Sequence, residues 1–151
     1  MATIFDVADW FLHQEAMTPK KLQKLCYYYK AWGLALYGED LLPDSVFEAW
    51  VHGPVNPELY RKYKGYYWTN IRRKRKNNAE TFTDNEIELL KAVWNTYGEL
   101  TANALEVQTH SESPWRKARA GIDEFTNSTT SIKNEDMKMY YRELYDSYQG
   151  E

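Results

Sequence analysis

The stretch that decides the fold covers residues 18–38 and reads TPKKLQKLCYYYKAWGLALYG. Thr18 caps a helix N-terminus well, and Pro19 is favoured in the first helical turn. Apolar residues then recur at helical spacing, at Leu22, Leu25, Cys26, Tyr29, Trp32, Gly33 and Leu36. Gly38 follows as a typical helix stop. These signals predict one long helix over residues 19–37, with a broad apolar face that needs other elements to cover it.

The same kinds of start signal recur along the chain. Thr83 with Glu86 is a capping box, and Asn56 and Ser113 each precede a proline, as Thr18 does. Gly98 is placed to end the helix that begins after Thr83. The predicted caps, in chain order, are Thr3, Thr18, Asn56, Thr83, Thr101, Ser113 and Asn134. We therefore predict about six to seven helices.

One segment does not have helical periodicity. Residues 46–53, VFEAWVHG, alternate roughly between apolar and polar side chains and end at a Gly-Pro pair. This pattern predicts a short extended segment or one arm of a small β-hairpin, and we expect a second strand near residues 80–83. Residues 126–131, TNSTTS, are predicted to form a polar loop. No linker divides the chain, so we predict a mainly α, single compact multi-helix domain over residues 1–151.

Composition limits the classes of protein that fit. A chain of 151 residues buries about two-thirds of its unfolded surface, so it needs no metal or disulfide to fold. The single cysteine, Cys26, forms no intrachain disulfide. A net charge of -3 gives no global field for nucleic acid or anionic membranes. The first residues carry no lysine or arginine, and no apolar run approaches the roughly 20 residues of a membrane span. We expect a cytoplasmic protein with no membrane association.

Aromatic residues are the compositional excess. They make up 16% of the chain, with 13 tyrosines and 6 tryptophans. Tyr and Trp combine a large apolar body with a polar tip, so they suit cores that open onto contact surfaces. They are also enriched where proteins bind one another. The excess fits an aromatic core whose outer side chains reach solvent with their polar tips, and it equally fits a binding surface.

The strongest charge block follows Tyr66, Tyr67 and Trp68 and consists of five consecutive cations: Arg72, Arg73, Lys74, Arg75 and Lys76. Such a run can contact phosphates, and aromatic residues beside it resemble single-strand binding surfaces. It can also meet an acidic patch on a protein, or simply form a solvated loop. The acidic overall charge and the lack of a recognition helix argue against a dedicated nucleic-acid binder.

No catalytic or metal-binding pattern is present. None of His13, His52 and His110 has metal-ligand spacing with a second His or Cys. No Gly-rich phosphate loop or nucleophile elbow occurs. His110 lies between serines and close to Glu112, but so close in sequence that a hydrogen-bonded corner between helices is the better interpretation. We expect a protein that is not an enzyme and that uses no cofactor and no metal.

Several motifs together resemble a known family. Residues 17–28, MTPKKLQKLCYY, and residues 48–60, EAWVHGPVNPELY, are similar in order and spacing to the two main blocks of the Panacea antitoxin domain. This family is also described as SocA-like or phage-associated GepA-like proteins. A third match consists of Tyr97-Gly98, Thr109-His110 and Pro114-Trp115. Cys26 departs from the pattern, since an aliphatic residue is usual there, but a core accepts that exchange.

The resemblance implies a compact helical fold and a function. It implies the antitoxin of a bacterial or phage toxin–antitoxin system, which neutralises its cognate toxin by direct protein contact. A related member acts as an adaptor that delivers its toxin to a cellular protease, so that mode stays open. The resemblance supplies no catalytic residues. The alternative from the residues themselves is a nucleic-acid-binding regulator that uses residues 72–76.

The motif residues divide into two predicted roles. Lys20, Lys21, Gln23 and Lys24 lie off the apolar face of the long helix, so we predict that they face solvent or a partner. The other predicted partner contacts are Trp50, His52, Tyr60 and the five cations of residues 72–76. Gly53 and Pro54 are predicted to form a stiff turn closed to residues with a Cβ. The remaining predicted structural residues are Thr109, His110, Pro114 and Trp115, whose indole would fill the corner between two helices.

Overall fold

The computed structural model describes residues 1–150 and is mainly helical, as predicted. Within those residues it has seven α-helices, two short 3-10 helices and one small antiparallel sheet. The α-helices are α1 (Ile4–Gln14), α2 (Pro19–Tyr37), α3 (Pro57–Tyr63), α4 (Asp84–Tyr97), α5 (Ala102–His110), α6 (Ser113–Ala118) and α7 (Asn134–Gln149). The strands are β1 (Glu48–Trp50) and β2 (Gly53–Val55), and the 3-10 helices are η1 (Lys64–Tyr66) and η2 (Ala79–Thr81).

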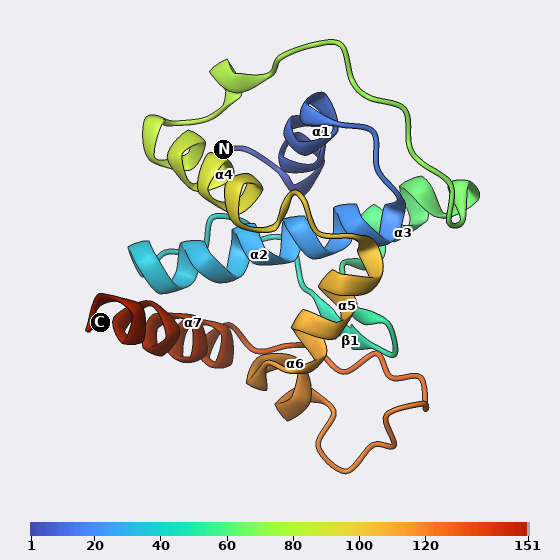
Figure 1. The fold of residues 1–151 in the computed structure, drawn as a ribbon, viewed down its shortest axis with the longest axis vertical. Helices are drawn as coiled ribbons and strands as arrows, with labels where there is room; N and C mark the ends of the chain where they lie inside the picture. The colour runs from blue at the N-terminus through green and yellow to red at the C-terminus, as the bar shows by residue number, and fades with distance from the viewer. Residues whose placement is uncertain (151) are drawn as a thin grey trace.

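Helix α2 is the axis around which the other elements pack. In Figure 1 it crosses the middle of the molecule, with α1 and α4 on one side and α7 on the other. Helix α3, helix α5 and strand β2 also contact it. As a result even Gln23, Lys24 and Lys30 of α2 are almost fully buried. A helix buried on nearly all sides explains why this stretch specifies the fold.

Most of the predicted helix starts are confirmed. The side chains of Thr3, Thr18, Asn56, Thr83 and Thr101 each accept a backbone N–H in the first turn of a helix. Gly38 adopts the left-handed conformation at the end of α2, with φ 68°. Two cap predictions are wrong, because α6 and α7 begin at Ser113 and Asn134, preceded by Glu112 and Lys133, without a side-chain cap.

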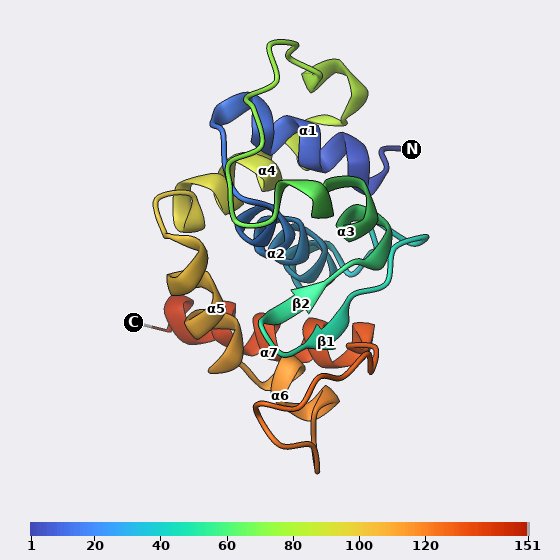
Figure 2. The same cartoon turned by 90° about the vertical axis from the view of Figure 1, so that its right-hand side faces the viewer.

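The predicted hairpin exists, but its second strand is not near residues 80–83. Strand β1 pairs with β2, in the register Glu48 to Val55 and Trp50 to Gly53, so the hairpin closes within the motif itself. Residues 79–81 instead form the 3-10 helix η2. The local turn at Val51 and His52 wins because it needs no long loop closure. Figure 2 shows this hairpin between α3 and the α6–α7 region.

The polar loop predicted over residues 126–131 runs beside the outer edge of the hairpin. The Ala49 N–H donates to the Thr130 carbonyl at 2.8 Å, and the Ile132 N–H donates to the Phe47 carbonyl at 2.8 Å. These bonds satisfy backbone groups of β1 and of Phe47 just before it, which would otherwise be left at an open edge. The segment therefore connects α6 to α7 while protecting the hairpin.

No helix within residues 1–150 combines the length and the apolar character needed to cross a bilayer.

Candidate partner-binding surface

An open groove of about 570 Å³ brings together two of the predicted partner residues, Lys20 and His52. Thr18 and Lys20 come from the start of α2, His52 comes from the hairpin turn, and residues 101–103 come from the start of α5. The fourth wall consists of Tyr67 and Trp68, which follow η1. Segments distant in sequence thus meet at one surface, which we call the aromatic groove.

Tyr67 and Trp68 were noted in the sequence only beside the basic run, and they were not among the predicted contacts with a protein partner. Their side chains are 73% and 83% exposed, and their ring centroids lie 5.9 Å apart. Tyr67 has φ 52°, an uncommon conformation for a residue with a Cβ. Exposed aromatic side chains beside a groove are candidate binding anchors. The available signal was three consecutive aromatics without apolar residues at helical spacing around them.

Lys20 and His52 share one acidic partner at the groove. Lys20 forms a salt bridge with Glu106 and donates to the Asn103 side chain at 3.0 Å. The Nδ1 of His52 lies 3.1 Å from Glu106 Oε1. Burial raises the pKa of Glu106, but the hydrogen bond and charge of Lys20 outweigh it and keep the pKa below the ordinary value. His52 is therefore exposed and Lys20 is partly exposed, and Glu106 of α5 orients both side chains.

Two other residues predicted at the surface are buried. Gln23 exchanges hydrogen bonds with the Asn56 backbone at 2.9 and 3.0 Å, beneath the start of α3. Lys24 is 1% exposed, and its Nζ donates to the Pro54 carbonyl at 3.3 Å. Burial lowers the pKa of Lys24 to about 7. The prediction that Gln23 and Lys24 face solvent or a partner is wrong, because the hairpin and α3 cover that side of α2.

Lys21 is half-buried, and its contacts join α2 to the end of α4. Its Nζ donates to the Gly98 carbonyl at 2.5 Å and lies 5.6 Å from the Trp94 ring centroid. The ammonium group thereby satisfies a carbonyl at the C-terminal end of α4, where the helix dipole favours a positive charge. Lys21 is therefore a structural residue more than a free contact.

The requirement for glycine at position 53 is supported by the structure, whereas the predicted turn lies at Val51 and His52 and Pro54 is part of strand β2. Gly53 has φ 109°, and a Cβ at this position would lie 2.5 Å from the Cε of Lys24. Both the backbone conformation and the space exclude other residues. The hairpin therefore packs over the Lys24 side chain and buries it in the core.

Trp50 and Tyr60 extend the candidate surface along the hairpin. Their rings meet edge to face with centroids 4.9 Å apart, and the Trp50 indole donates to Glu48 at 2.8 Å. Tyr60 is 42% exposed, while Trp50 is partly buried. A partner that covers His52 in the adjoining turn would also reach this aromatic pair.

The basic run is exposed but fastened to α1. The Lys74 N–H donates to the Leu12 carbonyl at 3.0 Å, and the Arg73 Nε donates to the His13 carbonyl at 2.7 Å. The His13 Nδ1–H in turn donates to the Lys74 carbonyl at 2.9 Å. Figure 1 shows this segment, in green, arching over α1. Arg73 and Lys74 thus lie at the C-terminal end of α1, where the helix dipole favours positive charge. The segment then continues along α1 to Asn78, whose side chain donates to the Asp6 carbonyl at 3.0 Å.

The predicted structural corner after α5 is confirmed. The rings of His110 and Trp115 stack with centroids 3.9 Å apart, and the Trp115 indole donates to the Trp50 carbonyl at 2.9 Å. Thr109 is buried and donates to the Glu106 carbonyl. His110 and Glu112 do not face one another, because Glu112 turns inward to accept from Tyr28 and Tyr141. His110, Glu112 and the neighbouring serines are therefore not arranged as a Ser–His–Glu triad.

Potential metal ligands do not cluster in the part of the chain that the structure describes. No group of three His, Cys, Asp or Glu side chains there is placed to hold an ion. Cys26 is fully buried, and burial raises the pKa of its thiol far above the ordinary value.

The architecture defines the class of protein: a mainly helical domain built around one buried helix and locked by a Gly-Pro hairpin. The family follows from comparison with family models, in which residues 22–116 match the model described as antitoxin SocA-like, Panacea domain. The chain belongs to this family. The matched range contains most of α2, the hairpin and the corner at Trp115, while α1 and α7 lie outside it. Neither the curated proteins nor the solved structures gave a match.

Proposed function

We propose that this protein is the antitoxin of a bacterial or phage toxin–antitoxin system, acting in the cytoplasm, and that it neutralises one cognate toxin protein by direct binding. Membership of the SocA-like antitoxin family is the observation that carries the proposal. In this function the protein is not an enzyme and needs no cofactor. Its action depends only on how tightly its surface holds the toxin.

The aromatic groove is the surface that supports this function best. Tyr67 and Trp68 expose most of their side chains, and a buried aromatic side chain contributes 150–250 Å² of contact area, roughly, in a complex. Stable interfaces bury about 800 Å² on each partner, so a toxin that binds the groove would also have to cover neighbouring residues such as the Trp50–Tyr60 pair. Lys20 and His52 would form the polar rim that sets orientation.

The test is co-expression with the product of the adjacent reading frame. We expect growth rescue of cells that express the toxin, and a stable complex in a pull-down under the same conditions. Rescue that also occurs in protease-deficient cells supports occlusion of the toxin, whereas rescue that requires the protease supports delivery as an adaptor. Absence of both rescue and complex contradicts the proposal.

A nucleic-acid-binding regulator is the second candidate, because Arg72 to Lys76 lie side by side on the exposed side of a fastened loop. Its signature is binding that weakens steeply with salt and disappears when all five residues are replaced by serine. Binding that is absent or insensitive to salt eliminates it. Toxin neutralisation by the same five-fold variant would show that the two functions are separate.

A further inference from the structure

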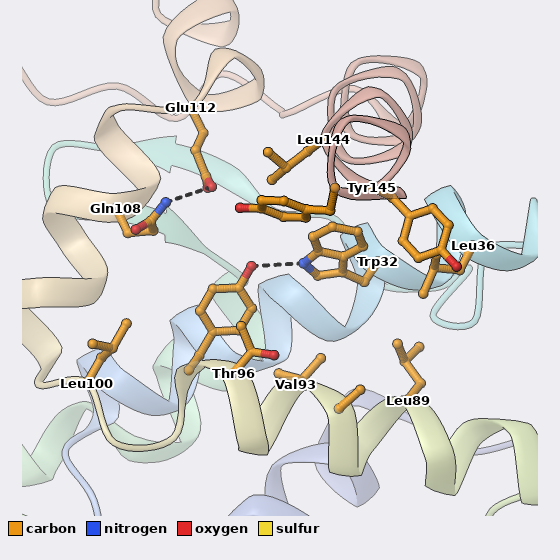
Figure 3. Close-up of a pocket in the computed structure, with 13 residues that line it drawn as sticks. Trp32, Leu36, Leu89, Val93, Thr96, Leu100, Gln108, Glu112, Leu144 and Tyr145 are labelled. Carbon is orange, nitrogen blue, oxygen red and sulfur yellow. Dashed lines mark hydrogen bonds between the residues drawn. The ribbon is translucent and has the colours of Figure 1, made fainter. Parts of the chain in front are cut away.

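A second concave site lies beside the molecule's central helix, α2. It is a cavity of about 430 Å³ enclosed by α2, α4 and α7, with the corner between α5 and α6 at one end. Figure 3 shows its largely apolar walls, which include Trp32, Leu36, Leu89, Val93, Leu144 and Tyr145. This volume falls within the range of about 300–1,000 Å³ that small-molecule sites occupy.

The polar end of the cavity is formed by Glu112. Its side chain is 1% exposed, and Oε1 accepts hydrogen bonds from the Tyr28 and Tyr141 hydroxyls at 2.8 Å each. Oε2 accepts only from the Gln108 amide, at 3.1 Å (Figure 3). All three donors are uncharged, and Glu112 makes no salt bridge with any residue in the 1–150 range.

A buried carboxylate without a cation is unusual. Burial disfavours the charged form, and neutral donors offset only part of that cost. Oε2 retains capacity for a further donor, since a carboxylate offers about four acceptor positions. A positively charged donor in the cavity would therefore gain more at this position than a neutral one.

The aromatic walls favour the same charge. Trp32 and Tyr97 both line the cavity and are joined by a hydrogen bond of 2.9 Å from the indole to the Tyr97 hydroxyl. Tyr145 and Tyr148 contribute further rings from α7. The faces of such rings attract organic cations, and the attraction grows where water is excluded.

We propose that this cavity binds an organic ammonium ion, with its apolar body between α4 and α7 and its ammonium group donating to Glu112 Oε2. This inference is independent of the toxin-neutralising function. The ammonium group can belong to a free amine or to a lysine side chain of a bound protein. The chemistry is the same, so the two sources are separated by experiment.

The test is calorimetric titration of the full chain with 2-phenylethylammonium and with the neutral isostere 2-phenylethanol. We expect the ammonium compound to bind roughly tenfold more tightly, as one charge-assisted hydrogen bond implies. Nα-acetyl-lysine methylamide is titrated in parallel, and tighter binding of one of the two ammonium compounds identifies its source. Equal affinity for amine and alcohol, or no saturable binding of either amine, overturns the proposal.

Two variants locate the site. Glu112→Gln removes the charge, so the preference for the amine should disappear. Ala92→Phe places a ring at the cavity, whereas Asn95→Phe adds the same ring elsewhere on α4 and serves as the matched control. We expect Ala92→Phe alone of this pair to abolish binding, and this comparison stands even where Glu112→Gln fails to fold. Amine binding that persists in Ala92→Phe contradicts the assignment.

Discussion

Helix α2 and the segment from Lys64 to Lys76, which we call the aromatic-basic arm, use the same residue types for opposite purposes. Both are rich in tyrosine, tryptophan and lysine. In α2, 13 of 19 residues are buried, and its tyrosines pack against one another and against Tyr141. In the arm only Ile71 is buried. The difference shows that an aromatic excess is a core in one place and an exposed surface in another, according to what packs over it.

The largest expected difference concerns stability. Leu25 of α2 is fully buried, so Leu25→Ala should lower the free energy of unfolding by about 3 kcal/mol through lost burial and a residual cavity. Trp68→Ala in the arm removes a larger side chain but should change it by less than about 0.5 kcal/mol. Urea denaturation of both variants measures this. Similar losses would remove the contrast between the two segments.

The glycines of the two regions sharpen the comparison. Gly53→Ala should lower the free energy of unfolding by about 2 kcal/mol, since φ is 109° and the new Cβ would meet Lys24 of α2. Gly65→Ala in the arm meets nothing within 4 Å, so we expect a change below about 0.5 kcal/mol. Replacing Lys24 by alanine as well should recover the part of the Gly53→Ala loss that comes from the contact. A double-mutant cycle that shows no coupling would refute this account.

Side chains of the aromatic-basic arm should contribute more to toxin binding than other exposed aromatic residues. On the proposed function, Trp68→Ala weakens the complex with the toxin by about 2 kcal/mol, roughly thirtyfold. Phe125→Ala is the matched control, because Phe125 is 82% exposed but does not line the aromatic groove. Affinity of the purified complex is the measurement. Equal losses for the two variants would exclude the groove as the toxin-binding surface.

The smallest expected effect is a pH dependence that originates in α2. With its pKa lowered to about 7, Lys24 is neutral in the folded protein where the unfolded chain still binds the proton. Stability from this group is therefore present at high pH and is lost as pH falls toward about 7. Between pH 7 and 8.5 the free energy of unfolding should rise by about 1–2 kcal/mol relative to Lys24→Met. Parallel curves for the two proteins would show that Lys24 is charged when folded.

Local signals predicted the fold well. Thr18-Pro19, Asn56-Pro57 and the Thr83–Glu86 box each involve residues within one turn of a helix, so no distant part of the chain can change them. The burial of Gln23 and Lys24 was not predictable. Hydrophobic periodicity assigns the polar face of a helix to solvent, and it cannot show that the hairpin and α3 cover that face of α2. The strand expected near residues 80–83 failed for a similar reason, since pairing is a tertiary choice.

The candidate surface was predictable only in part. His52 and Tyr60 are exposed and Lys20 is partly exposed, while Thr109, His110 and Trp115 form the expected corner. Tyr67 and Trp68 were noted only as aromatic neighbours of the basic run, and the sequence did not single them out as contacts for a protein partner. Tyr67 and Trp68 follow η1 in a stretch where residues 64–70 are all exposed, and the sequence alone does not reveal this exposure.

The hydrogen bonds that join Tyr28 and Tyr141 to Glu112 bear on how the protein is made. Three residues from α2, the α5–α6 corner and α7 must meet before this buried carboxylate is satisfied. A ribosome that adds roughly 10 residues per second leaves on the order of ten seconds between synthesis of Tyr28 and Tyr141. Until α7 has been synthesised, the side of α2 that Tyr141 covers has no partner from that helix, so this part of the core closes last.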